Sequence, residues 1–227
     1  MKRFVWKIVK IPLRIAFLSI AIACVQAMVS LPFTKDSQSF GFFITAFGFV
    51  AISLLGMRIF KILDLVLPLY VICHELTHLI IAKMFKKETG ELMIGLKSGY
   101  VEVKDANLLI VLGPYLVPFY TLVWIIISPL VNLVVQNESF SEMFLLGIGG
   151  TYAFHMIFTA DKICEAQPDF DFDGRVFSIL MILAANLLTI YFCMALFLGE
   201  ITHCIPQLFS AFKSQWGLCM MVYELFA

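Results

Sequence analysis

Charged residues are scarce in this chain. Lysine, arginine, aspartate and glutamate together make up 14% of its 227 residues, whereas they make up about a quarter of a typical soluble domain. Hydrophobic residues account for 61% of the chain, and the mean hydropathy is +0.95. This composition excludes an ordinary water-soluble globular protein and predicts an integral membrane protein.

An excess of positive charge is also absent. The formal net charge is zero, with 16 basic and 16 acidic side chains, and the basic residues are scattered along the chain. Proteins that bind nucleic acid usually carry a basic patch, because they must neutralise phosphate groups. We therefore expect no nucleic-acid partner, and we expect the lipid bilayer to surround most of the chain.

Closely spaced cysteine pairs are missing as well. The six cysteines stand singly, and most of them lie inside apolar runs. This spacing excludes a zinc ribbon and a Cys-x-x-Cys redox motif. It favours buried cysteines that pack as small hydrophobic side chains.

Long apolar runs are present, and there are about six of them, each near the ~20 residues that a helix needs to cross a bilayer. The first run is longer than the apolar region of a usual signal peptide, so we expect it to be retained as a span. We predict an all-α integral membrane protein that forms a single membrane domain over residues 1–227. The expected spans are 11–33, 39–59, 62–84, 107–135, 142–162 and 175–199.

Two parts of this plan depart from simple spans. The fourth run is long, and Pro114, Pro118 and Pro129 are expected to break or kink it, because proline removes a backbone donor. Residues 201–227 mix apolar and polar side chains. This segment is expected to form an amphipathic helix at the membrane surface.

The connection that follows the third run has an unusual pattern. Residues 92–103 place β-forming side chains on both sides of Lys97-Ser98-Gly99. Near-alternation around a glycine-containing turn predicts a short β-hairpin, and an ordinary polar loop is the alternative.

Histidine is rare, and two of the four histidines fall in one motif of the third run, His74-Glu75-Leu76-Thr77-His78. Residues at i and i+4 share a helix face, so the two imidazoles can hold one metal ion. Glu75 is rotated off this line, where it can reach a water molecule but is poorly placed as a ligand. This division of roles is typical of zinc hydrolases. A hydrogen-bonded cluster without metal is the less favoured alternative, because ionisable groups are costly in a membrane.

A catalytic zinc ion needs a third protein ligand and leaves its fourth position to water. The acidic stretch before the sixth run offers three candidates, Asp169, Asp171 and Asp173. The third run ends, and the sixth begins, on the same side of the membrane, so the acids and the histidines are expected at one depth. Asp171 alternates with the other two and is expected to face solvent.

Two further histidines stand outside this pattern. His155 lies in the later half of the fifth run and approaches the same side of the membrane. Helix packing or hydrogen bonding is its favoured role. The alternatives are that it binds the metal itself, or that it contacts the metal's ligands or the substrate. His203, in the tail, is expected to be interfacial.

The motif His74–His78 in a membrane span, with Pro168 five residues before Asp173, resembles the site-2 protease family of intramembrane zinc metalloproteases. The resemblance covers about residues 62–200, and the chain would be a divergent, minimal member without a PDZ domain. It implies that His74 and His78 are zinc ligands, that Glu75 is the general base and that Asp173 is the third ligand.

The chain also departs from the family pattern. Phe172 stands where the family has leucine, and Glu165 stands where asparagine is common. More divergent members carry a Gln-Pro-Asp sequence, which corresponds here to Gln167-Pro168-Asp169. In that alignment Asp169 would replace Asp173 as the third ligand.

The sequence thus predicts a metalloendopeptidase that uses Zn²⁺ to cleave membrane-spanning or membrane-associated proteins, in the plasma (inner) membrane of a prokaryote. Its activity should fail at acidic pH, because only neutral imidazoles bind metal. The alternatives are a catalytically inactive metal-binding scaffold, a transporter-like protein, or a zinc peptidase that acts on soluble peptides. Glu75 favours an enzyme, because a scaffold does not need a carboxylate at that position.

Overall fold

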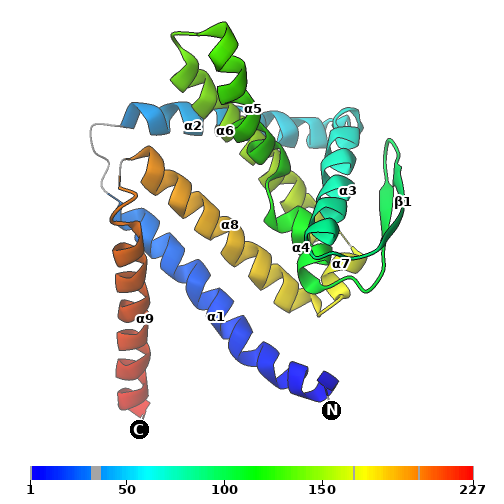
Figure 1. The fold of residues 1–227 in the computed structure, drawn as a ribbon. Coiled ribbons are helices and arrows are strands. Elements are labelled where there is room, and N and C mark those ends of the chain that lie inside the picture. Colours follow the sequence, from blue (N-terminus) through cyan, green and yellow to red (C-terminus); the bar gives the residue numbers. More distant parts are fainter. Residues whose placement is uncertain (1, 32–36, 166, 199, 227) are drawn as a thin grey trace. The chain divides into compact units, whose positions relative to one another are not determined.

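A computed structural model describes residues 2–31, 37–165, 167–198 and 200–226 (Figure 1). Most of them are helical, and the only strands among them form one hairpin. The helices are α1 (Lys2–Ser30), α2 (Ser37–Ile59), α3 (Leu67–Met84), α4 (Leu108–Leu116), α5 (Phe119–Val135), α6 (Phe140–Cys164), α7 (Pro168–Asp171), α8 (Arg175–Phe197) and α9 (Cys204–Phe226). The strands are β1 (Thr89–Ile94) and β2 (Gly99–Val103), and a 3₁₀ turn, η1 (Leu63–Leu65), precedes α3.

The prediction of an all-α membrane protein is confirmed. Within the described residues, α1, α2, α3, α6 and α8 each contain a stretch long and apolar enough to cross a membrane, and α4 with α5 forms a bent sixth candidate. Large apolar side chains also face outward, including Val134 at 85% exposure and Phe49 at 73%. Such exposure suits lipid contact. The predicted span ends at 32–33 and 199 lie outside the described residues.

The break in the fourth predicted span occurs at one of its three prolines. The axes of α4 and α5 differ by 64°. Val117 has extended backbone angles (φ −110°, ψ 112°), and Pro118 caps the start of α5. A residue before proline avoids the helical region, which explains why the helix stops there. Pro114 and Pro129 lie inside α4 and α5 without ending them.

The chain divides into two compact units, residues 1–40 with 174–227, and residues 41–173. In the first unit, α1 packs against α8 and α9. Its core contains small side chains such as Ala23, Cys24 and Ala195, which let helices approach closely. Helix α9 covers most of the predicted amphipathic tail. Its place at the membrane surface, like the single membrane domain, stays a prediction.

The second unit contains α2 to α7 and the hairpin. A hydrogen bond links its helices α5 and α6: Trp124 Nε1–H donates to the Phe144 carbonyl oxygen at 3.0 Å. Helices α2 and α6 share an ion pair between Arg58 and the buried Asp161. Gly149 of α6 faces the backbone of Phe43 in α2, where a Cβ atom would collide with the Phe43 carbonyl oxygen.

The hairpin prediction is confirmed, although the hairpin starts at residue 89 rather than 92. Strands β1 and β2 are antiparallel, with Ile94 opposite Gly99, and the Gly95 N–H donates to the Ser98 carbonyl at 2.9 Å. Both strands lie beside α3 (Figure 1). At Gly99, a Cβ atom would lie 2.7 Å from Glu75 Cγ and 3.0 Å from Val71 Cγ1. Only glycine lets the strand lie this close to the helix.

We expect Gly149→Ala to destabilise the protein by about 1–3 kcal/mol, because the added methyl group forces α2 and α6 apart. Gly150→Ala is the matched control, since its Cβ atom would meet only Val50 Cγ2 at 3.4 Å. Both changes gain the same helix propensity, so their difference isolates the helix contact. Denaturant unfolding in detergent measures both variants, and equal midpoints would contradict the close contact.

Candidate metal centre

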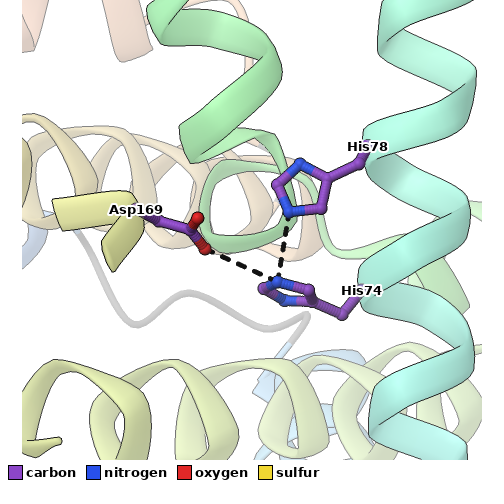
Figure 2. Close-up of side chains that lie close together, drawn as sticks. All are labelled: His74, His78 and Asp169. Carbon is purple, nitrogen blue, oxygen red and sulfur yellow. Dashed lines mark hydrogen bonds and ion pairs between the residues drawn. The ribbon is translucent and has the colours of Figure 1, made fainter. Parts of the chain in front are cut away.

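His74 and His78 project from the same face of α3 toward Asp169 on α7 (Figure 2). Their Nε2 atoms lie 3.2 Å apart, and Asp169 Oδ2 lies 3.6 Å from His74 Nε2. One ligand atom from each of the three residues falls within 4.8 Å of the other two. This is the only group of histidine, cysteine and acidic residues within the described part of the chain that could hold a metal ion. Two imidazoles and one carboxylate form a ligand set that suits zinc.

His78 is oriented by the start of α4. Its Nδ1 atom lies 2.7 Å from the carbonyl oxygen of Ile110. That carbonyl is available because its helical partner four residues later is Pro114, which has no N–H to donate. The Asn107 side chain accepts from the Ile110 N–H at 3.0 Å and fixes this turn. With Nδ1–H donated to the carbonyl, the Nε2 lone pair of His78 is left for a metal ion.

His74 is oriented by its own helix. Its Nδ1 atom lies 2.9 Å from the hydroxyl of Tyr70, one turn earlier on α3. Tyr70 is buried and stacks on Phe158 of α6, with ring centroids 4.8 Å apart and an interplanar angle of 11°. The His74 ring also meets the ring of Tyr115 edge to face at 5.2 Å. These contacts fix the direction of the imidazole.

Asp169 sits in the first turn of α7, a short helix that Pro168 opens. The next residue, Phe170, is fully buried against the ring of Tyr115 at 4.7 Å and anchors the turn. The Tyr115 hydroxyl donates to Asp169 Oδ2 at 2.9 Å. Burial alone would raise the pKa of Asp169, but the two neighbouring imidazoles and the Tyr115 hydroxyl outweigh it and hold the pKa below its ordinary value. Asp169 is therefore a carboxylate, the form that binds metal.

Glu75 does not belong to the three-residue group, but it lines the same cavity. The cavity has a volume of about 360 Å³ and is walled by the three residues of the group, by Glu75, by strand β2 and by the segment that leads into α7. Glu75 is 6% exposed, and Gly99 packs directly against its Cγ atom. Glu75 and the three residues of the group therefore line the same cavity.

The remaining candidates from the sequence do not belong to this group. Asp173, the first choice for the third ligand, is not part of the group, because the helical turn opened by Pro168 brings Asp169 to the histidines and has ended before residue 173. Asp171 is exposed, as expected. His155 is not part of the group either; its ring lies 5.9 Å from that of Tyr152 on its own helix, α6. His203 is exposed just before α9.

Three features of the site were missed at the level of sequence: the hydroxyls of Tyr70 and Tyr115 and the carbonyl of Ile110. Tyr70 carried a usable signal, since it precedes His74 by four residues and so shares its helix face. Tyr115 and Ile110 reach the site only through the packing of α4 on α3, which no local pattern encodes.

Comparison with known proteins adds no relative. No protein-family model matches the chain, and neither a curated protein nor a solved structure is significantly similar to it.

We expect Pro114→Ala to weaken Zn²⁺ binding about tenfold, because residue 114 would gain an N–H that competes with His78 for the Ile110 carbonyl. Competition with a chromophoric chelator on the detergent-solubilised chain measures the affinity. Pro129→Ala, which restores an N–H inside a helix that carries no ligand, should bind zinc like the wild type. Equal affinities in the two variants would show that the Ile110 carbonyl does not orient His78.

Proposed function

We propose that this chain is an intramembrane zinc metalloprotease of the site-2 protease type. Its expected substrates are membrane-spanning or membrane-associated proteins, and its expected location is the plasma membrane of a prokaryote. The observation that carries the proposal is the convergence of His74, His78 and Asp169 beside Glu75, with the motif inside a candidate membrane span. Ionisable residues at such a depth are costly, which favours a functional reason for their presence.

The residues fit a zinc ion of the catalytic kind. Such sites use three protein ligands and keep one position open, and here three ligand atoms border a cavity of about 360 Å³. Both histidines have a hydrogen-bond partner at Nδ1, which leaves Nε2 for the ion. The short helix α7 supplies the carboxylate, so the geometry favours Asp169 over Asp173 as the third ligand.

The chemistry follows from the positions of the side chains. A zinc ion held there would supply Lewis acidity, which makes a water molecule more acidic and polarises a peptide carbonyl. Glu75, on the wall of the same cavity, would accept a proton from the attacking water on its carboxylate and return it to the leaving amine. Glu75 is buried, and electrostatic interactions in such surroundings are stronger than in water, which would favour both proton transfers.

Strand β2 offers a place for an extended substrate. A helical substrate hides its carbonyls in its own hydrogen bonds, so it must unwind before attack. Residues of β2 line the cavity, and β2 pairs only with β1 among the described strands. Its other edge could pair with an unwound peptide by strand addition. Such pairing would lay the scissile bond beside Glu75, against which Gly99 packs.

Metal analysis of the purified chain tests the proposed ligands. We expect about one zinc ion per chain in the wild type, retention in Asp173→Ala, and loss in His74→Ala and Asp169→Ala, because each loss leaves only two protein ligands. Loss in Asp173→Ala with retention in Asp169→Ala would reverse the assignment of the third ligand. If the wild type takes up no zinc, even on reconstitution, the proposal of a zinc metalloprotease is refuted.

Glu75→Gln tests the general base. We expect this variant to keep its zinc and to lose cleavage by at least ~10²-fold, since an amide cannot accept the proton. The assay uses proteoliposomes with a labelled single-span peptide, and mass spectrometry reads the new ends. Glu142→Gln, an exposed change on α6, is the control and should cleave normally. If Glu75→Gln binds zinc and cleaves as well as the wild type, Glu75 is not the base. If the wild type and both variants bind zinc but none cleaves the peptide, a metal-binding scaffold is favoured.

A further inference from the structure

We propose that a second cavity beside Glu75 binds a carboxylate of the substrate, so that the chain prefers peptides with an acidic group close to the cleaved bond. Two lysines line this cavity, Lys97 in the turn of the hairpin and Lys162 on α6. Because the cavity lies beside the proposed catalytic residues, its role rests on the function proposed above and defines a substrate class for it.

The second cavity adjoins the cavity of the metal centre. It has a volume of about 140 Å³. The two cavities share four lining residues, His74, Glu75, Gly99 and Gln167. From there the metal-centre cavity continues toward the later turns of α3, at His78, and the second cavity continues toward the first turns, at Leu67 and Tyr70. A group bound in the second cavity would therefore lie next to the proposed general base and a proposed zinc ligand.

Strand β2 leads from one cavity into the other. Most of its residues line the metal-centre cavity, whereas the turn residues just before it, Lys97 and Ser98, line the second cavity. An extended peptide that pairs with β2 advances by about 3.3 Å per residue. A carboxylate within about two or three residues of the bond beside Glu75 would therefore reach the second cavity.

The lining of the second cavity is rich in donors for an anion. Among the described residues that line it, Lys97 and Lys162 are cations and Glu75 is the one acid. A zinc ion held by His74 would add to the positive potential. Ser98 and Gln167 contribute a hydroxyl and an amide, which are neutral donors. Ammonium groups attract a carboxylate by charge, and the neutral donors can share its remaining lone pairs.

Both lysines also have an acidic partner in the chain. Lys162 Nζ donates to Glu165 Oε2 at 2.8 Å, and Lys97 pairs with Asp64. Neither acid is among the described residues that line the cavity. An ammonium group has three donors, so one such pair leaves donors for a second carboxylate. Lys97 and Asp64 are both exposed, and an exposed ion pair can open at little cost.

The position of Lys162 shows how the fold keeps a positive charge at the cavity. Its side chain is 15% exposed, and its Nζ atom lies 5.6 Å from the centroid of the Tyr70 ring, which also lines the cavity. An aromatic face attracts a cation at this distance. An ammonium group with so little access to water is costly unless anions surround it. A substrate carboxylate would add a second anionic partner to that of Glu165.

Cleavage of a matched set of peptides tests the preference. Labelled single-span peptides in proteoliposomes carry glutamate, glutamine or lysine in turn at the positions next to the cleaved bond, which mass spectrometry locates. We expect glutamate to raise kcat/KM about tenfold over glutamine at one position, and lysine to lower it, because hydrogen bonds to charged groups are the stronger ones. Peptides that end at this position as the free acid or the amide show whether a chain terminus can supply the carboxylate. Equal rates throughout would overturn the site.

Charge variants identify the groups responsible. Lys97→Glu should reverse the preference from glutamate to lysine, and Lys162→Gln should weaken it. Lys104→Glu is the control, because Lys104 is an exposed lysine at the base of the hairpin, pairs with Glu88 at 2.9 Å and is not among the described residues that line either cavity. Lys97 is exposed, so its variant decides the question even if Lys162→Gln has a lower unfolding midpoint. An unchanged preference in Lys97→Glu, or an equal change in Lys104→Glu, would overturn the site.

Binding separates this site from the proposed protease. The full wild-type chain is freed of zinc by a chelator in detergent, and fluorescence anisotropy measures its affinity for the same peptides. We expect the glutamate peptide to bind about tenfold more tightly than the glutamine peptide. The difference should shrink as salt is added and disappear in Lys97→Glu. If no peptide is ever cleaved, the protease is refuted, whereas equal binding of the two peptides to the wild type would refute the carboxylate site alone.

Discussion

The contact between α3 and α4 is the constraint on which the candidate site depends. At Gly113 the two helices come so close that a Cβ atom would collide with the Ile81 side chain and lie 3.7 Å from Thr77 Cγ2. This approach brings the Ile110 carbonyl to His78 and the Tyr115 ring to His74. A wider spacing would remove both contacts and leave polar groups without partners in an apolar environment, at a cost of several kcal/mol.

Much of the fold follows from sequence because a bilayer allows few solutions. A backbone that crosses hydrocarbon must satisfy its hydrogen bonds internally, so long apolar runs become helices, and their approximate positions could be read directly. The break at Pro118 and the hairpin around residues 95–98 were also encoded locally, by proline sterics and by a turn between β-forming residues. The motif from His74 to His78 required only helical periodicity.

The third ligand and the groups behind the ligands were not encoded locally. Asp169 and Asp173 lie four residues apart in one acidic stretch, and both satisfy the argument from membrane depth. What separates them is the burial of Phe170 against Tyr115, a contact between residues 55 positions apart in the chain. Pattern and composition cannot rank two carboxylates when tertiary packing of a neighbouring residue decides which one turns inward.

The packing of Gly99 against Glu75 has a consequence for how a peptide substrate would be recognised. The backbone of Gly99 in β2 packs directly on the Glu75 side chain of α3, and this contact sets the distance between the strand and the helix. A peptide paired with that strand would be placed by its own main chain, and its side chains would point to either face of the pairing. At the positions that pair with β2, such an enzyme would select a substrate by where its helix unwinds rather than by its amino-acid sequence. Its selectivity at those positions would then come from the ease with which a membrane helix opens, and substrates of otherwise unrelated sequence could share one cleavage site in the bilayer.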